Sequence, residues 1–154
     1  MKKRYYLAYG SNLNIKQMRY RCPGARIIGK AEIKDYRLLF KGSKTGSYLT
    51  IEPMKGSTVP VAVWEVTPDD ELRLDRYEGY PSFYYKKELN LKVTGIKTGK
   101  IYDRCAFVYI MHEERPLGIP TVDYFSTCCI GYENFKFNRQ LLINAYYDSL
   151  EGKK

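Results

Sequence analysis

The feature that most constrains this chain is a glycine-centred turn at the end of its first apolar run. Residues 4–9 alternate in polarity, which predicts a strand, and residues 14–20 have a helical pattern. Asn14 and Gln17 have the spacing of a capping box at the start of that helix. Gly10 lies between the strand and the helix and permits backbone angles that other residues resist. The sequence therefore predicts a strand-to-helix turn whose outward N–H groups can receive a carboxylate or an oxyanion, the alternative being an ordinary turn.

A second motif lies in the middle of the chain and describes a complete short helix. Residues 67–70, Thr-Pro-Asp-Asp, supply a capping hydroxyl, a first-turn proline and two carboxylates at the positive helix end. The helix is expected to end near Glu78, because Gly79 suits the left-handed residue that terminates a helix. If the face of Leu74 is buried, Glu78 lies inward, and both burial and the negative helix end raise its pKa. The alternative is a solvated glutamate beside Arg76.

The other elements are a run of strands followed by helices. Strands are expected over residues 25–33, 36–40, 48–52, 59–66, 83–93 and 101–110. Pro53 and Gly56 are expected to close one strand, and pairing of the next is expected to begin after Pro60, at Val61. This order is neither regularly alternating nor all-β. It predicts one α+β domain over residues 1–154, with a mixed, strongly curved, barrel-like sheet and flanking helices.

The last two helices have recognisable starts. Thr121 is placed to cap a helix that carries Tyr124, and Asn138 is placed to cap the final one. No apolar run approaches the ~20 residues of a membrane span, and the first apolar run is too short for a signal peptide. We therefore expect a cytoplasmic protein of 154 residues, large enough to bury a core without disulfides.

The cysteines and the single histidine do not form a metal-binding pattern. Cys22, Cys105, Cys128 and Cys129 contain no Cys-x-x-Cys pair, and His112 has no neighbouring ligand residues. Buried thiols that act as small hydrophobes are the expected role for the cysteines. The sequence predicts neither a metal site nor a cofactor.

The chain has a formal net charge of +9, which is compatible with nucleic acid, an anionic membrane surface or an acidic small substrate as partner. The lysines and arginines are scattered over turns and chain ends, without a helix-turn-helix, zinc-finger or RNA-recognition signature. We therefore expect a lysine-rich surface with no nucleic-acid or membrane partner. A monomer and a homodimer are both compatible with the sequence.

Three segments together resemble the gamma-glutamyl cyclotransferase-like (AIG2-like) family. They are Tyr9-Gly10-Ser11-Asn12-Leu13, Asp75-Arg76-Tyr77-Glu78-Gly79-Tyr80-Pro81, and Thr121-Val122-Asp123-Tyr124 followed by Ile130-Gly131. The resemblance extends from about Tyr5 to Tyr132 and implies the same curved-sheet fold. It also implies a metal-independent enzyme, an acyltransferase with lyase-type cyclisation, that releases 5-oxoproline from a gamma-glutamyl amino acid or amine.

The resemblance assigns roles to individual residues. It implies that Glu78 is the catalytic general acid/base. It implies that substrate is bound by Tyr9, Gly10, Ser11, Asn12, Leu13 and Tyr124. The chain departs from the family's Gly-Leu-Pro at residues 135–138, Phe-Lys-Phe-Asn, so the leaving-group side of the pocket is not predicted.

The chemistry explains why no nucleophile or metal is needed. In a gamma-glutamyl compound the α-amine can attack its own γ-carbonyl and close a five-membered lactam, because the two groups are already tethered. One carboxylate can then take the ammonium proton and return it to the leaving amine, while N–H groups bind the oxyanion or the substrate carboxylate. Two alternatives remain, a non-catalytic small-ligand binding member of the fold and a basic nucleic-acid-binding domain.

Overall fold

The computed structural model of the chain describes residues 2–43 and 46–153. Along the chain the elements are β1 (Arg4–Ala8), the 3-10 turn η1 (Ser11–Leu13), α1 (Ile15–Arg21), β2 (Arg26–Ser43), β3 (Gly46–Val66), α2 (Pro68–Glu78), β4 (Tyr84–Gly95), β5 (Ile101–Met111), α3 (Val122–Asn134) and α4 (Gln140–Lys153).

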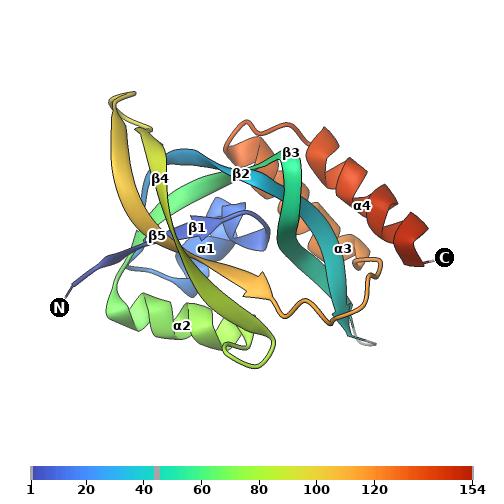
Figure 1. Cartoon of the computed structure of the whole chain (residues 1–154). Helices are drawn as coiled ribbons and strands as arrows, with labels where there is room; N and C mark the ends of the chain where they lie inside the picture. The colour runs from blue at the N-terminus through green and yellow to red at the C-terminus, as the bar shows by residue number, and fades with distance from the viewer. Residues whose placement is uncertain (1, 44–45, 154) are drawn as a thin grey trace.

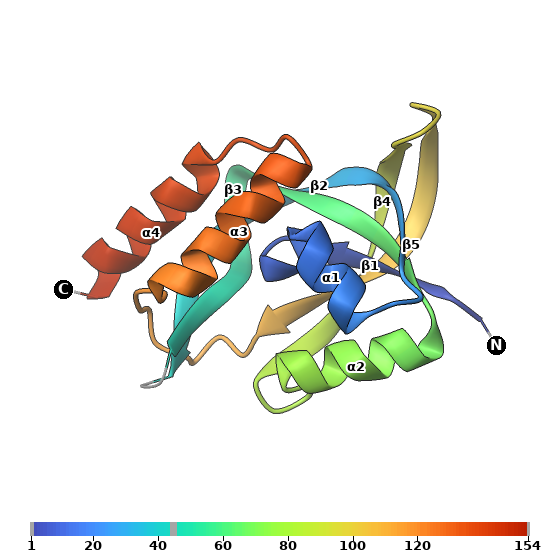
Figure 2. The ribbon, with the colours of Figure 1, turned by 180° about the vertical axis from the view of Figure 1, so that it is seen from behind.

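The five strands form one closed barrel in the order β1-β3-β2-β4-β5 (Figure 1). Neighbouring strands are antiparallel except β1 and β5, which run parallel at Tyr6 and Phe107. The predicted α+β fold with a mixed, strongly curved, barrel-like sheet and flanking helices is therefore confirmed. Helix α2 lies below the barrel in this view, and α3 and α4 lie side by side along another flank (Figures 1 and 2).

The hairpin of β2 and β3 is longer than the sequence predicts. Instead of four short strands, two long ones pair continuously, apart from register shifts at Ile27/Gly29 and Lys34/Tyr36. The predicted break at residues 34–35 is a bulge, in which Asp35 adopts a positive φ of 63° and its carboxylate accepts from the N–H of Gly56 at 2.9 Å.

The expected strand breaks at Pro53 and Pro60 are wrong, and the sheet topology explains why. Pro53 pairs with Tyr36 and Pro60 with Glu32, both on β2. The other neighbour of β3 is β1, which pairs with it only from Ala62 onward within the described residues. At both prolines β3 thus has a neighbour on one side only, and the missing N–H interrupts no second ladder.

The helix caps follow the sequence predictions. Asn14 Oδ1 accepts from the N–H of Gln17 at 3.1 Å, and Thr67 Oγ1 accepts from the N–H of Asp70 at 3.1 Å. Gly79 ends α2 with a left-handed φ of 64°. These contacts fix where α1 and α2 begin and where α2 ends.

Helix α4 packs against β2, and α3, beside it, packs against η1 (Figure 2). Thr121 Oγ1 accepts from the N–H of Tyr124 at 3.2 Å, and Asn138 Oδ1 accepts from the N–H of Gln140 at 3.0 Å, as predicted. Buried Ser149 joins α4 to β2 by accepting from the N–H of Phe40 at 2.9 Å. In the part of the chain that the structure describes, no helix combines the length and the apolar character needed to cross a bilayer.

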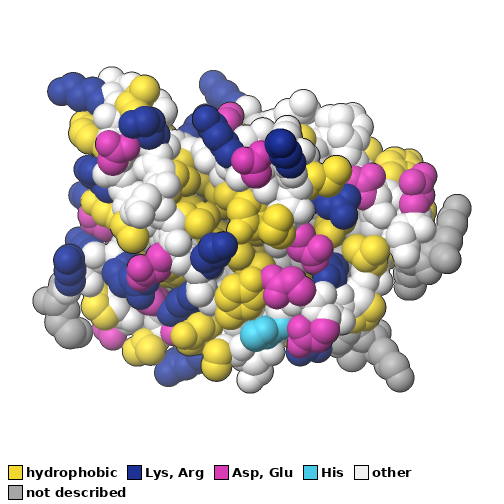
Figure 3. Space-filling view, viewed as in Figure 1, with side chains coloured by type: hydrophobic (Ala, Val, Ile, Leu, Met, Phe, Trp, Pro, Cys, Tyr) yellow, Lys and Arg dark blue, Asp and Glu magenta, His cyan; other side chains and the backbone are white. Residues whose placement is uncertain are grey.

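Charged side chains are distributed over the surface in both signs. Figure 3 shows lysine and arginine side chains spread across one face and interspersed with acidic ones, not gathered in a stripe. Several are paired with carboxylates, as Lys3 and Arg26 are with Glu65. A mixed distribution of this kind is typical of a solvated surface.

Candidate active site

The turn after β1 presents its backbone to a pocket. The N–H of Leu13 donates to the carbonyl of Gly10 at 3.0 Å, and that of Asn14 donates to Ser11 at 3.0 Å, which closes η1. Among residues 2–43 and 46–153, the N–H groups of Gly10, Ser11 and Asn12 have no acceptor. They are therefore free to donate to a ligand, as the sequence predicts for this turn.

Gly10 suits this position both by its backbone angles and by the space around it. Its φ of −126° and ψ of −126° lie outside the regions that other residues commonly adopt, as expected, although φ is not left-handed. A Cβ at this position would lie 3.3 Å from the Tyr124 hydroxyl and 3.4 Å from Leu49 Cδ1. The Tyr124 hydroxyl in turn accepts from the N–H of Leu49 at 3.1 Å. The glycine thus lets three segments approach one another at the pocket wall.

The side chains of the turn are used within the protein to position two tyrosines. Ser11 Oγ lies 2.9 Å from the Tyr77 hydroxyl, and Asn12 Nδ2 donates to the Tyr6 hydroxyl at 2.9 Å. Arg21 donates to Asn12 Oδ1, and its guanidinium stacks 3.4 Å above the Tyr77 ring. The backbone of the turn, and not its side chains, is therefore the part that is free to contact a ligand.

Leu13 is the one predicted binding residue that lies outside the pocket. Its side chain is completely buried, in contact with α3. A Cβ at Gly131 would lie only 2.6 Å from Leu13 Cβ, so a glycine at this point of α3 allows the close approach. Leu13 therefore anchors the turn to the helix layer and does not face a ligand.

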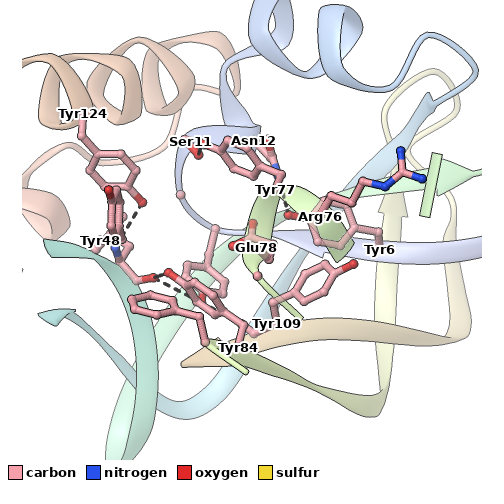
Figure 4. A pocket seen from close by; sticks show the side chains of 15 residues that line it. Tyr6, Ser11, Asn12, Tyr48, Arg76, Tyr77, Glu78, Tyr84, Tyr109 and Tyr124 are labelled. Carbon is pink, nitrogen blue, oxygen red and sulfur yellow. Dashed lines mark hydrogen bonds between the residues drawn. The ribbon is translucent and has the colours of Figure 1, made fainter. Parts of the chain in front are cut away.

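Glu78 faces the free backbone of the turn from the last residue of α2 (Figure 4). Its side chain is half-buried, and within the described residues its carboxylate has no hydrogen-bond or ion-pair partner. Burial raises the pKa of Glu78 from 4.5 to about 8, and the nearby Arg21 charge opposes this rise. The raised pKa predicted from the sequence is thus present, with burial as its main cause.

The inner end of the pocket is formed by tyrosines whose hydroxyls are already bonded. Tyr9 donates to the carbonyl of Tyr109 at 2.7 Å, and Tyr84 donates to the carbonyl of Leu49 at 2.8 Å. Burial raises the pKa of both Tyr9 and Tyr84 well above its usual value, so these hydroxyls stay neutral. This end of the pocket is rigid and uncharged.

A charge network holds α2 against the barrel directly behind the pocket. The Tyr109 hydroxyl donates to Asp75 at 2.6 Å, and Lys86 Nζ lies 2.8 Å from Asp75 and 2.6 Å from Glu71. Arg4 completes the network with a 2.8 Å contact to Glu71. Because Asp75 is one turn before Glu78, the network fixes the helix end that carries the unpaired carboxylate.

The pocket has a volume of about 430 Å³ and unites most of the predicted residues. Its lining residues are Tyr6, Tyr9, Gly10, Ser11, Asn12, Tyr48, Leu49, Arg76, Tyr77, Glu78, Gly79, Phe83, Tyr84, Tyr109 and Tyr124. Of these, Glu78 is the only acid. A cavity of this size with one polar focus is typical of a small-molecule site.

Sequence reasoning missed five of the lining tyrosines and the arginine next to them. Tyr6, Tyr48, Tyr77, Tyr84 and Tyr109 come from five different elements, which no local pattern brings together. The high tyrosine content, 16 residues, was the one available signal for a hydroxyl-rich cleft.

Two further regions concern residues 135–138 and the side chains that could bind a metal ion. Residues 135–138 lie outside the pocket, with Phe135 packed against Trp64 and Phe137. Among the described residues, no three His, Cys, Asp or Glu side chains gather in a group that could hold a metal ion.

The fold and the pocket together define a class of protein. It has a closed barrel and a pocket in which one carboxylate without a partner among the described residues faces a turn with free backbone N–H groups. Residues 6–126 match the family described as gamma-glutamyl cyclotransferase, AIG2-like. Gamma-glutamylcyclotransferase from Homo sapiens is 30% identical over 133 residues, covering 82% of this chain and 68% of that protein. The Bos taurus protein of the same name is 30% identical over 134 residues with the same coverage. A solved structure named gamma-glutamyl cyclotransferase has a TM-score of 0.72 and 25% identity, covering 94% of this chain and 86% of the other. The chain therefore belongs to the gamma-glutamyl cyclotransferase, AIG2-like family.

Proposed function

We propose that this protein releases 5-oxoproline from a gamma-glutamyl amino acid or amine by intramolecular cyclisation, with Glu78 as the general acid/base. The observation that carries the proposal is the half-buried Glu78 carboxylate, which faces the free N–H groups of the turn and has no partner among the described residues. A structural carboxylate in this position would be expected to have a cation or a hydrogen-bond donor.

The pKa of Glu78 supports its role in proton transfer. The α-ammonium of a gamma-glutamyl compound loses its proton only above neutral pH, and burial raises the pKa of Glu78 toward that range, to about 8. Raising the pKa of Glu78 thus brings donor and acceptor closer, which favours transfer in both directions. Glu78 takes a proton from the substrate ammonium, and the freed amine attacks the γ-carbonyl to close the five-membered ring. That proton goes to the leaving nitrogen as the C–N bond breaks, and the second proton, which the attacking nitrogen loses as it becomes the lactam N–H, passes to the regenerated Glu78 carboxylate and from there to the released amine or to water.

The free N–H groups of Gly10, Ser11 and Asn12 supply the second requirement of the reaction. They can bind the substrate carboxylate or the oxyanion that forms on the γ-carbonyl oxygen. Tyr124 lies across the same wall and holds Leu49 in place, so we assign it to the pocket rather than to proton transfer. Tyr9 shapes the inner end through its bond to Tyr109.

The test measures 5-oxoproline after incubation with a panel of gamma-glutamyl dipeptides and gamma-glutamylamines. Wild-type protein is compared with Glu78→Gln, which keeps the shape of the side chain and removes its proton exchange. Glu151→Gln, at an exposed position of α4, is the matched control for the same chemical change elsewhere. We expect product from wild type and from Glu151→Gln, and a loss of about 10²–10⁴-fold in Glu78→Gln.

Equal rates in all three proteins would contradict a catalytic role of Glu78. If no protein forms product but substrates bind intact to the wild type, the chain is the non-catalytic ligand-binding member of the family instead.

A further inference from the structure

The side of the pocket around Tyr48 differs in character from the side around Tyr6 and Tyr109. The Tyr48 ring forms edge contacts with Tyr124, at a centroid distance of 5.1 Å, and with Phe83, at 6.2 Å. Tyr48 is 39% exposed, whereas Tyr6 and Tyr109 are 4% and 2% exposed. The three outer rings, Tyr48, Phe83 and Tyr124, are here called the aromatic wall.

The aromatic wall is preorganised by contacts from three separate segments. Tyr48 comes from β3, Tyr124 from α3, and Phe83 from the turn that follows α2. The guanidinium of Arg115 lies 4.4 Å from the Phe83 ring centroid, and the Tyr84 ring packs on Phe83 at 5.3 Å. The aromatic wall therefore offers apolar ring faces to a ligand.

The direction in which a substrate must lie follows from the proposed function, on which this inference rests. The α-amine and the γ-carbonyl react with each other and must both lie next to Glu78. Figure 4 shows Tyr48 and Tyr124 on one side of Glu78, and Tyr6 and Tyr109 on the other. Because Tyr6 and Tyr109 are buried and close the pocket on their side of Glu78, the substituent of the leaving amine extends the other way, along the aromatic wall toward the exposed Tyr48.

We propose that the preferred substrate has a leaving amine with an aromatic side chain, which packs on Tyr48 and Phe83. An aromatic group in contact with preoriented rings gains both apolar burial and favourable edge-to-face geometry. A methyl group in the same place leaves the Tyr48 ring in water and gains neither. An aromatic leaving group therefore raises kcat/KM by roughly tenfold over a methyl-bearing one.

The experiment uses four substrates that separate the aromatic ring from the carboxylate of the leaving group. They are gamma-glutamyl-phenylalanine, gamma-glutamyl-alanine, gamma-glutamyl-phenethylamine and gamma-glutamyl-ethylamine. Values of kcat/KM for 5-oxoproline release are measured for all four. We expect each aromatic substrate to exceed its small counterpart by roughly tenfold, with or without the carboxylate.

Three variants assign the preference to the wall. Tyr48→Ala is expected to reduce the aromatic preference to about twofold or less, and Tyr48→Phe to retain it, because the ring and not the hydroxyl makes the contact. Tyr20→Ala is the control, since Tyr20 is 91% exposed on α1. Thermal unfolding of each variant shows that the comparison is made on folded protein.

The outcomes separate this inference from the proposed function. Product from all four substrates with no aromatic preference, or a preference that survives in Tyr48→Ala, overturns the inference and leaves the cyclotransferase proposal intact. If no substrate gives product, binding of intact gamma-glutamyl-phenylalanine and gamma-glutamyl-alanine is measured by calorimetry. Tighter binding of the aromatic compound, lost in Tyr48→Ala, then supports the wall as a subsite without turnover, and equal binding overturns it.

Discussion

Two carboxylates on the last turn of α2 show how the same chemical group serves different ends. Asp75 is bonded to the Tyr109 hydroxyl and to Lys86, and Lys86 is bonded in turn to Glu71. Glu78, three residues later, faces the pocket and has no such partner among the described residues. The partly buried Asp75 carboxylate is satisfied by these partners, whereas burial without a partner raises the pKa of Glu78 to about 8. The paired acid holds the helix, and the unpaired one is available for proton transfer.

The largest expected effect is seen when each of the two carboxylates, Asp75 and Glu78, is replaced by the corresponding amide and the two variants are compared. Glu78→Gln is expected to lose about 10²–10⁴-fold in 5-oxoproline release with no loss of stability, because no partner is left unsatisfied. Asp75→Asn is expected to lower the free energy of unfolding by about 1.5–3 kcal/mol, because a charge-assisted hydrogen bond is removed. Urea denaturation and the activity assay on both variants measure the two effects. A destabilised Glu78→Gln protein would contradict the distinction between a functional and a structural acid.

The next prediction concerns how the titration of Glu78 makes the free energy of unfolding depend on pH. Its pKa is 4.5 in the unfolded chain and about 8 in the folded protein, so the folded state binds the proton more tightly. Its contribution to stability is therefore complete below pH 4.5 and is lost as the pH rises to 8. Glu78→Gln does not titrate, so its stability relative to wild type should rise across this window, by on the order of a few kcal/mol.

Denaturation of both proteins at pH 4.5, 6, 8 and 9 measures this difference. We expect the free energy of unfolding of Glu78→Gln to exceed that of wild type by nearly zero at pH 4.5 and by a constant amount above pH 8. A difference that does not change with pH would mean that Glu78 is ionised in the folded protein at all these values.

A smaller effect is expected from Lys86, the cation paired with Asp75. Lys86→Met leaves Asp75 without its cation, and we expect a loss of about 2 kcal/mol in the free energy of unfolding. This is less than the 3–5 kcal/mol for a fully buried pair, because the side chains of Lys86 and Asp75 are 15% and 20% exposed. Lys87→Met, at the exposed neighbouring position, is the control. Equal stability of the two variants would show that the network does not hold α2.

The smallest effect concerns Arg21, whose charge lowers the pKa of Glu78. The charge of Arg21 lowers the pKa of Glu78 against the larger effect of burial, so Arg21→Met is expected to raise this pKa further. The rise of activity with pH, which follows deprotonation of the base, should then move to higher pH. Arg19→Met, on the exposed face of α1, is expected to leave the profile unchanged. A shift in the opposite direction would refute the assigned influence of Arg21.

Features fixed by neighbouring residues could be predicted from the sequence. The caps at Asn14 and Thr67 and the helix end at Gly79 depend on contacts within four residues, and the structure has them where the spacing indicates. The inward position of Glu78 follows from its four-residue separation from buried Leu74. The raised pKa of this residue was predictable for the same reason.

Features that depend on distant pairing could not be predicted. Whether Pro53 and Pro60 end a strand depends on how many neighbours the strand has at that point, which is a property of the whole sheet. Tyr84 and Tyr109 reach the pocket only because β4 and β5 close the barrel against β1. Leu13 has the motif of a binding residue, but its contact with Gly131, more than a hundred positions away, places it in the core.

The junction of β2 with β4 has a consequence for how the molecule fluctuates. The two strands pair at Gly29–Gly95 and Lys30–Thr94, where a Cβ on Gly29 would lie 2.2 Å from the Thr94 carbonyl oxygen. Beyond this short ladder, a groove lined in part by Leu89 separates β2 from β4. Figure 3 shows apolar side chains at the centre of the face viewed. So short a ladder costs little free energy to open, and its amide hydrogens should exchange with solvent well before those of the long hairpin. Glu78, the free turn and the aromatic wall are all away from this junction, so the barrel can open there while the pocket stays assembled.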